Sequence, residues 1–182
     1  MTNYADYESR LHELRDEMTA RIHALEKDLH HRHRLDVNVF DTSGVRISDF
    51  KEWVNRLCPA IKATDKGQSF ICAVAHMNIA AQAMQTRRPA IEECDAGLVK
   101  IVVPIFIDDT FLGAVGACGL LLDEGEVDTF LIDKTTGIDE ETAQKLAAGV
   151  GTISSAGAAS LAEDVTRRIA SIVTAYKNNR QS

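Results

Sequence analysis

The sequence is short of positive charge and of long apolar runs, and each shortage disfavours a class of protein. It holds 20 lysines and arginines against 27 aspartates and glutamates, a net charge of −7 with histidine neutral. Nucleic-acid-binding domains need clustered positive charge to displace counterions, so direct nucleic-acid binding is not expected. The apolar runs fall far short of the roughly 20 residues of a membrane span, and the N-terminus lacks the pattern of a secretory signal. We therefore expect a cytoplasmic protein with no membrane segment.

Motifs that carry catalysis are also missing. The sequence contains no G-x-S-x-G, no H-E-x-x-H and no phosphate-binding loop. The adjacent carboxylates Asp108 and Asp109 fit a hairpin turn, where turn chemistry explains them. We therefore expect the protein not to be an enzyme.

Apolar residues recur at helical spacing at both ends of the chain. The first segment, residues 4–34, predicts a short coiled-coil helix with one stutter. Its apolar positions are Tyr4, Tyr7, Leu11, Leu14, Met18, Ile22, Leu25 and Leu29. A final helix over about 155–177 carries Leu161, Val165, Ile169, Ile172 and Tyr176 on one stripe. Such narrow stripes need a partner, so the first helix packs either on its copy in a homodimer or on the final helix.

The middle of the chain predicts a mixture of helices and antiparallel strands. The segment 36–47 fits a strand or hairpin, and 98–108 and 110–122 fit two apolar strands joined by a turn. A further strand is expected over 90–94. Helices are expected over 48–63, ending at Pro59, over 69–86 with a small-residue stripe at Ile71, Val74, Ala75 and Asn78, and over 127–136 and 139–149.

The stretches "LCPAI", "FICAVAHMNIAAQAM", "RRPAIEECDAGL" and "VKIVVPIFIDDTFLGAV" resemble the PocR sensory domain family over roughly residues 36–150. This family comprises ligand-binding input domains of prokaryotic regulators. The resemblance implies an α+β fold, a PAS-like antiparallel sheet covered by helices, and recognition of a small molecule such as a short diol, without catalysis. Because no output domain follows, it implies an output protein as a separate partner.

The resemblance and the periodicities together divide the chain into three parts. Residues 1–34 form the N-terminal coiled-coil helix, residues 35–150 the PocR-like sensory domain, and residues 151–182 the C-terminal helix and tail. We expect a homodimer that signals through the long terminal helices.

Four cysteines, Cys58, Cys72, Cys94 and Cys118, are spaced C-x13-C-x21-C-x23-C, which matches no compact metal motif. In a cytoplasmic protein they should be reduced. In a PAS-like layout the helices cover the sheet, so the four thiols are expected to meet in one pocket. They would then bind an iron–sulfur cluster, of the 4Fe–4S type, or a structural zinc ion. Otherwise each is a small packed hydrophobe.

Five further residues are expected to line this pocket. His76 follows Cys72 by four residues and therefore shares its helix face. Gly116 and Gly119 flank Cys118 and would leave room for a bound group. Asp95 and Gly97 belong to the "CDAGL" motif that carries the resemblance.

Three functions follow from these patterns. The first is a redox or gas sensor built around an iron–sulfur cluster. The second is a receptor for a small organic ligand, with the cysteines merely packed. The third is a structural zinc-binding scaffold.

Overall fold

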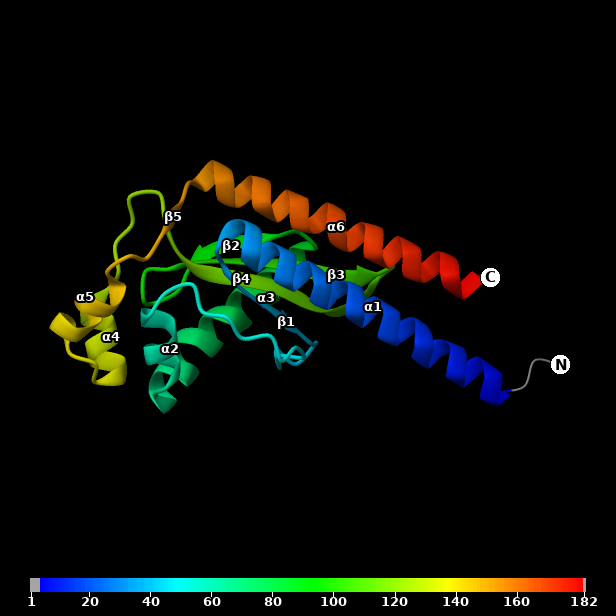
Figure 1. Ribbon diagram of the computed structural model, residues 1–182, viewed down its shortest axis with the longest axis horizontal. Helices are drawn as coiled ribbons and strands as arrows, with labels where there is room; N and C mark the ends of the chain where they lie inside the picture. Colours follow the sequence, from blue (N-terminus) through cyan, green and yellow to red (C-terminus); the bar gives the residue numbers. More distant parts are fainter. Residues whose placement is uncertain (1–3, 182) are drawn as a thin grey trace.

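The computed structural model describes the backbone of residues 4–181 and the side chains of residues 16–179. The elements follow the order α1 (Tyr4–His33), β1 (Asp36–Phe40), α2 (Leu57–Lys62), η1 (Gly67–Ala73), α3 (Val74–Thr86), β2 (Ala90–Glu93), β3 (Val99–Ile107), β4 (Thr110–Leu122), α4 (Thr129–Thr136), α5 (Glu140–Ala147), β5 (Thr152–Ile153) and α6 (Ser155–Gln181). This is the expected α+β fold, an antiparallel sheet with helices on both faces (Figure 1).

The sheet is built on the β3–β4 hairpin. Both strands are rich in β-branched and apolar residues, and the turn at Asp108 takes a left-handed conformation (φ 52°). β1 pairs antiparallel with β4 and β2 with β3, which gives the strand order β1-β4-β3-β2. Pro104 lies beyond the end of β2, so its missing N–H costs no pairing on that side. The two-residue strand β5 extends the sheet by pairing parallel with the end of β4.

Alternation along the strands gives the sheet two different faces. On one face Val37, Val39, Val103 and Val115 pack against the terminal helices α1 and α6. The other face carries Asp36, Asn38 and Phe40 on β1, Lys100 on β3 and Cys118 on β4. The polar residues of the sheet therefore face the short helices.

The terminal helices α1 and α6 pack against each other and form one layer that covers a face of the sheet. Ile22, Leu25 and Leu29 of α1 share a core with Leu161 and Val165 of α6. Over the described side chains, therefore, the partner of α1 is α6 of the same chain, which was one of the two expected partners. The earlier part of the predicted stripe, Tyr4 to Leu14, lies outside the described side chains, and α1 extends there past the sheet (Figure 1).

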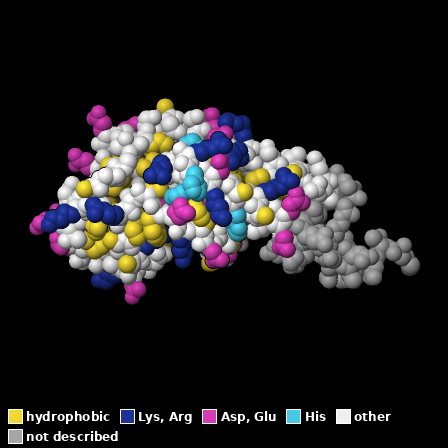
Figure 2. Space-filling view, in the orientation of Figure 1, with side chains coloured by type: hydrophobic (Ala, Val, Ile, Leu, Met, Phe, Trp, Pro, Cys, Tyr) yellow, Lys and Arg dark blue, Asp and Glu magenta, His cyan; other side chains and the backbone are white. Residues whose placement is uncertain are grey.

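The helices on the other face form two groups. α3 packs on β2 and β3 through Ile79 and Ala83. A separate core joins α2, η1, α4 and α5, with Leu57, Ile71 and Ile132 fully buried. On the face shown in Figure 2, lysines and arginines are interspersed with aspartates and glutamates. Among the described residues, no helix combines the length and the apolar character that a membrane crossing requires.

Two local predictions are wrong. The helix expected over 48–63 is reduced to Leu57–Lys62, and Pro59 lies in its first turn, where proline is tolerated, instead of at its end. The preceding segment is irregular instead of helical, and in it the backbone N–H of Val54 donates a hydrogen bond to the carboxylate of Asp36 (2.9 Å).

The helix expected over 69–86 is present but its stripe is shifted. Residues 67–73 form a π-helical turn, which is wider than an α-turn, and the following α-helix therefore starts in a different phase. The buried residues of α3 are His76, Ile79 and Ala83, whereas Val74 is 41% exposed.

Candidate functional site

All four cysteines line one pocket between the sheet and the short helices. They come from four different places in the fold: α2 carries Cys58, η1 carries Cys72, the turn after β2 carries Cys94, and β4 carries Cys118. None forms a disulfide. We call this cavity the cysteine pocket; its lining residues are Asp36, Asn38, Phe40, Trp53, Cys58, Ile61, Lys62, Ile71, Cys72, Ala75, Cys94, Ala96, Leu98, Lys100, Cys118 and Gly119.

The sheet supplies the polar floor of the cysteine pocket. Asp36 and Lys100 both pair with Cys118 in the strand register, so the three form one row across β1, β4 and β3. Lys100 is 8% exposed, and its ammonium group lies 6.0 Å from the centre of the Phe40 ring. No hydrogen bond or ion pair joins its ammonium group to another described residue.

Asn55 connects the segments that carry two of the thiols. Its amide oxygen accepts from the backbone N–H of Cys58 (2.8 Å), and its amide nitrogen donates to the carbonyl of Gly119 (2.8 Å) and to the sulfur of Cys58 (3.3 Å). The start of α2 is thereby tied to β4.

Burial controls the protonation of the pocket. It raises the pKa of the Cys58 thiol well above its ordinary value, that of Cys72 to about 11, and that of Cys118 against the opposing effect of Lys100. Burial also raises the pKa of Asp36 to about 6. These thiols are therefore protonated at neutral pH when no metal is bound.

The donor set can be compared with two kinds of inorganic group. Among the described residues, no three or more histidine, cysteine, aspartate or glutamate side chains are grouped closely enough to hold a single metal ion. The arrangement therefore gives no support to a structural zinc ion. Four cysteines are nevertheless the ligand number of a 4Fe–4S cluster, whose ligands bind four separate iron atoms.

The other residues expected in the pocket lie elsewhere, with one exception. Gly119 lines the cysteine pocket, whereas His76 lines a neighbouring one. Asp95 is exposed, and Gly97 (φ +80°) lies under the backbone of Glu126, where a Cβ would come within 2.2 Å of the carbonyl oxygen.

The glycines of β4 make room for the chain itself. A Cβ on Gly116 would lie 3.1 Å from the Phe40 ring and 3.7 Å from Nδ1 of His76. A Cβ on Gly119 would lie 2.9 Å from Val54 and 3.0 Å from the Asp36 carboxylate.

Sequence reasoning missed the polar residues of the pocket floor. Asp36 and Asn38 alternate with valines in "DVNVF", and Lys100 interrupts the apolar run "LVKIVV". Polar residues at every second position of an otherwise apolar strand share one face, and that signal would have identified them.

No curated protein and no solved structure matches the chain. A family model, described as the sensory domain found in PocR, matches residues 19–175. That range includes the whole sheet, both pockets, the second half of α1 and most of α6, and the family favours a sensory role over catalysis. The chain therefore belongs to the PocR sensory domain family.

Proposed function

We propose that the protein is a sensory domain whose cysteine pocket binds an iron–sulfur cluster through Cys58, Cys72, Cys94 and Cys118. One observation carries this proposal: every cysteine of the protein lines the same pocket, although they come from four separate elements. Free cysteines ordinarily pack singly as small buried hydrophobes, which gives no reason for all four to share one cavity.

The charges around the thiols support an anionic occupant. A cluster bound by four thiolates is negatively charged, and Lys62 and Lys100 line the same pocket. The ammonium group of Lys100 forms no ion pair with any described residue, and a bound anion would supply that partner.

Assembly would be coupled to proton release. The thiols of Cys58, Cys72 and Cys118 have raised pKa values, and a thiol must lose its proton to become a ligand. When bound, such a cluster supplies redox or gas-responsive chemistry tuned by charge, hydrogen bonds and solvent access.

Signalling would start in the short helices. The interior of the cysteine pocket measures about 40 Å³, so a larger group must displace part of its wall. The wall is formed partly by α2 and η1, and Asn55 transmits a displacement of α2 to β4. β4 in turn shares a core with α1 and α6 on the opposite face.

The test is purification without oxygen, followed by iron and sulfide analysis and a visible spectrum. We expect about four iron and four sulfide per chain and a brown protein that bleaches in air. Each Cys→Ser variant should lose colour, whereas Met77→Ser, at an exposed position of α3, should keep it. A colourless wild-type protein with little iron after reconstitution would refute the proposal.

A small organic ligand is the second candidate, and the pocket floor favours it. Oδ2 of Asp36 is buried and has no hydrogen-bond partner in the described chain, and Asn38 and Lys100 lie on the same sheet face. These groups suit a ligand with hydroxyl groups, such as a short diol.

The cluster and the small organic ligand predict opposite effects of substitutions at Cys118 and Asp36. If propanediol is the ligand, it should raise the melting temperature of the wild type and of Cys118→Ser but not of Asp36→Asn. If the cluster is the ligand, Cys118→Ser should abolish loading, whereas Asp36→Asn should still load it.

A further inference from the structure

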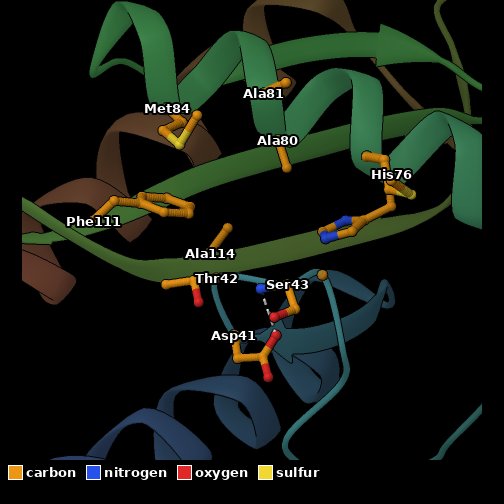
Figure 3. Close-up of a pocket in the computed structure, with 11 residues that line it drawn as sticks. Asp41, Thr42, Ser43, His76, Ala80, Ala81, Met84, Phe111 and Ala114 are labelled. Atoms are coloured by element: carbon orange, nitrogen blue, oxygen red, sulfur yellow. Dashed lines mark hydrogen bonds between the residues drawn. The ribbon is translucent and has the colours of Figure 1, made fainter.

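A second cavity lies beside the cysteine pocket, between α3 and the turn at residues 41–44. Its volume is about 150 Å³, larger than the interior of the cysteine pocket. Met77, Ala80, Met84 and Phe111 give it apolar walls, and the 41–44 turn provides a polar rim. Figure 3 shows the turn facing α3, with Met84 and Phe111 toward one end of the pocket and His76 toward the other.

His76 is the buried polar group of this cavity. It is 3% exposed, and neither ring nitrogen has a hydrogen-bond partner in the described chain. Figure 3 shows its imidazole extending from α3 toward the strand that carries Ala114. Buried polar side chains are nearly always hydrogen-bonded, so two unpaired nitrogens indicate a partner from outside the chain.

The imidazole is held in one orientation. It stacks on Phe40 with the ring centres 3.6 Å apart and the planes inclined by 27°. The ring pair lies over Gly116, where a Cβ would crowd the Phe40 ring at 3.1 Å and be in ordinary contact with Nδ1 of His76 at 3.7 Å. A binding group fixed by its own packing is preorganised, which lowers the cost of binding.

The chemistry of the cavity selects an uncharged molecule. Burial and the nearby Lys100 and Lys62 lower the pKa of His76 to about 3, so the ring is neutral and offers one donor and one acceptor. No lysine or arginine lines the cavity, so an anion would find no partner there. Oδ1 of Asp41 is already occupied by the N–H groups of Ser43 (2.8 Å) and Val45 (2.9 Å).

Size sets the other limit. The cavity is open to solvent on the side of Met77 and Met84, which are 60% and 40% exposed. For scale, an enclosed apolar cavity of about 150 Å³ engineered in another protein accepts benzene. Methionine and aromatic walls suit a flat, polarisable ligand, since thioether sulfur contacts aromatic rings favourably.

We propose that this cavity is a second binding site, for an uncharged molecule of about one six-membered ring that carries a single hydroxyl group hydrogen-bonded to His76. This site is separate from the cysteine pocket and shares with it only the wall formed by the stacked rings of Phe40 and His76. The proposal does not depend on what the cysteine pocket binds.

The experiment measures binding of phenol, toluene and benzoate to the full chain by isothermal titration and by ¹⁵N NMR of the imidazole. Phenol should bind and shift the His76 ring signals, toluene should bind about tenfold more weakly because it lacks the hydroxyl, and benzoate should not bind.

Three variants locate the site. His76→Phe keeps a ring against Phe40 and should bring phenol down to the affinity of toluene. Ala80→Leu fills the cavity and should abolish the binding of both phenol and toluene. Cys118→Ser, a change confined to the cysteine pocket, should leave both unchanged. The proposal is overturned if the wild type does not bind phenol, if His76→Phe binds it as tightly as the wild type, or if only Cys118→Ser weakens it.

Discussion

Cys72 lies in the wall of the cysteine pocket, where burial raises the pKa of its thiol from 9.0 to about 11. Two units correspond to a roughly 100-fold smaller thiolate fraction at neutral pH, and the thiolate is the nucleophile. We expect iodoacetamide at pH 7.5 to alkylate Cys72 about 100-fold more slowly in the folded metal-free protein than in urea. Cys58 and Cys118, whose pKa values burial also raises, should likewise react more slowly in the folded protein than in urea. Peptide mass spectrometry of timed samples measures each site, and equal folded and unfolded rates would contradict the argument.

Asp36 is a second residue whose charge is costly in the fold. Burial raises its pKa from 3.8 to about 6, so the folded state binds a proton more tightly than the unfolded state. Ionising Asp36 therefore costs more free energy in the folded state than in the unfolded state. The resulting loss of stability is small at pH 4, grows as the pH rises, and reaches about 3 kcal/mol above about pH 6. Asp36→Asn keeps an oxygen for the N–H of Val54 and should remove this slope.

Urea unfolding at pH 4.5 and pH 7.5 tests the Asp36 prediction. The variant should gain stability relative to the wild type at the higher pH, and the gain should shrink at the lower pH. An unchanged difference between the two proteins at both values would show that Asp36 is not the titrating group.

At the scale of elements, the local sequence pattern predicted those helices and strands that are stabilised mainly by contacts between residues close in the sequence. The β3–β4 hairpin was predictable because two apolar strands flank Asp108 and Asp109, which suit a tight turn. Helices α4 and α5 were predictable as well; Asp139 caps α5 by accepting from the N–H of Thr142 (2.8 Å).

Elements shaped by distant contacts were not predictable. Residues 48–56 have helical spacing, yet Val54 bonds to Asp36 and Asn55 to Gly119, so long-range hydrogen bonds override the local preference. The π-helical turn before α3 shifted its buried stripe and brought His76 into a cavity of its own. For the same reason the spacing of the cysteines carried no metal signal, whereas the topology brings all four to one pocket.

Gly119 shows how closely β4 and the segment before α2 are packed. Its φ of +103° is unfavourable for other residues, and a Cβ would come within 2.9 Å of Val54. Gly137 also has a positive φ (+77°), but a Cβ there meets nothing within 4 Å. We expect Gly137→Ala to cost about 1 kcal/mol through the backbone alone, and Gly119→Ala to cost about 3 kcal/mol because packing is added.

Urea unfolding of the two glycine variants, at equal protein concentration, measures the difference directly. If both alanines cost the same, the segment before α2 yields freely and is not held against β4.

At the scale of the whole molecule, the sheet separates the two pockets from the terminal helices. One face carries both pockets and the short helices, and the other carries α1 and α6. The β3–β4 turn touches both sides. Arg87, just after α3, pairs with Asp109 (2.9 Å) and donates to the carbonyl of Asp108 (2.6 Å), while Lys177 of α6 contacts the Asp108 carboxylate. The turn between β3 and β4 therefore contacts both the end of α3 and α6.

The first half of α1 is the part of the molecule that best suits a second copy. The described apolar residues of α1, from Ile22 onward, are already buried against α6 and the sheet. The same stripe continues in the sequence at Leu11 and Leu14, where the helix extends past the sheet (Figure 1). A narrow apolar stripe beyond the core is the pattern of a coiled-coil seam, so we propose that it pairs with its copy in a homodimer.

Light scattering coupled to size-exclusion chromatography should find the wild type as a dimer, and a Leu11→Asp/Leu14→Asp double variant as a monomer with an unchanged circular dichroism spectrum. Ser9→Asp adds negative charge at a position between the seam residues and should leave the dimer intact. Because Ile22, Leu25 and Leu29 anchor α1 within its own chain, the double variant loses only the partner and not the fold. A wild-type protein that is monomeric at high micromolar concentration would contradict the proposed dimer. The first half of α1 could then not pass a signal to a second copy, and α6 would be the remaining terminal helix for that role.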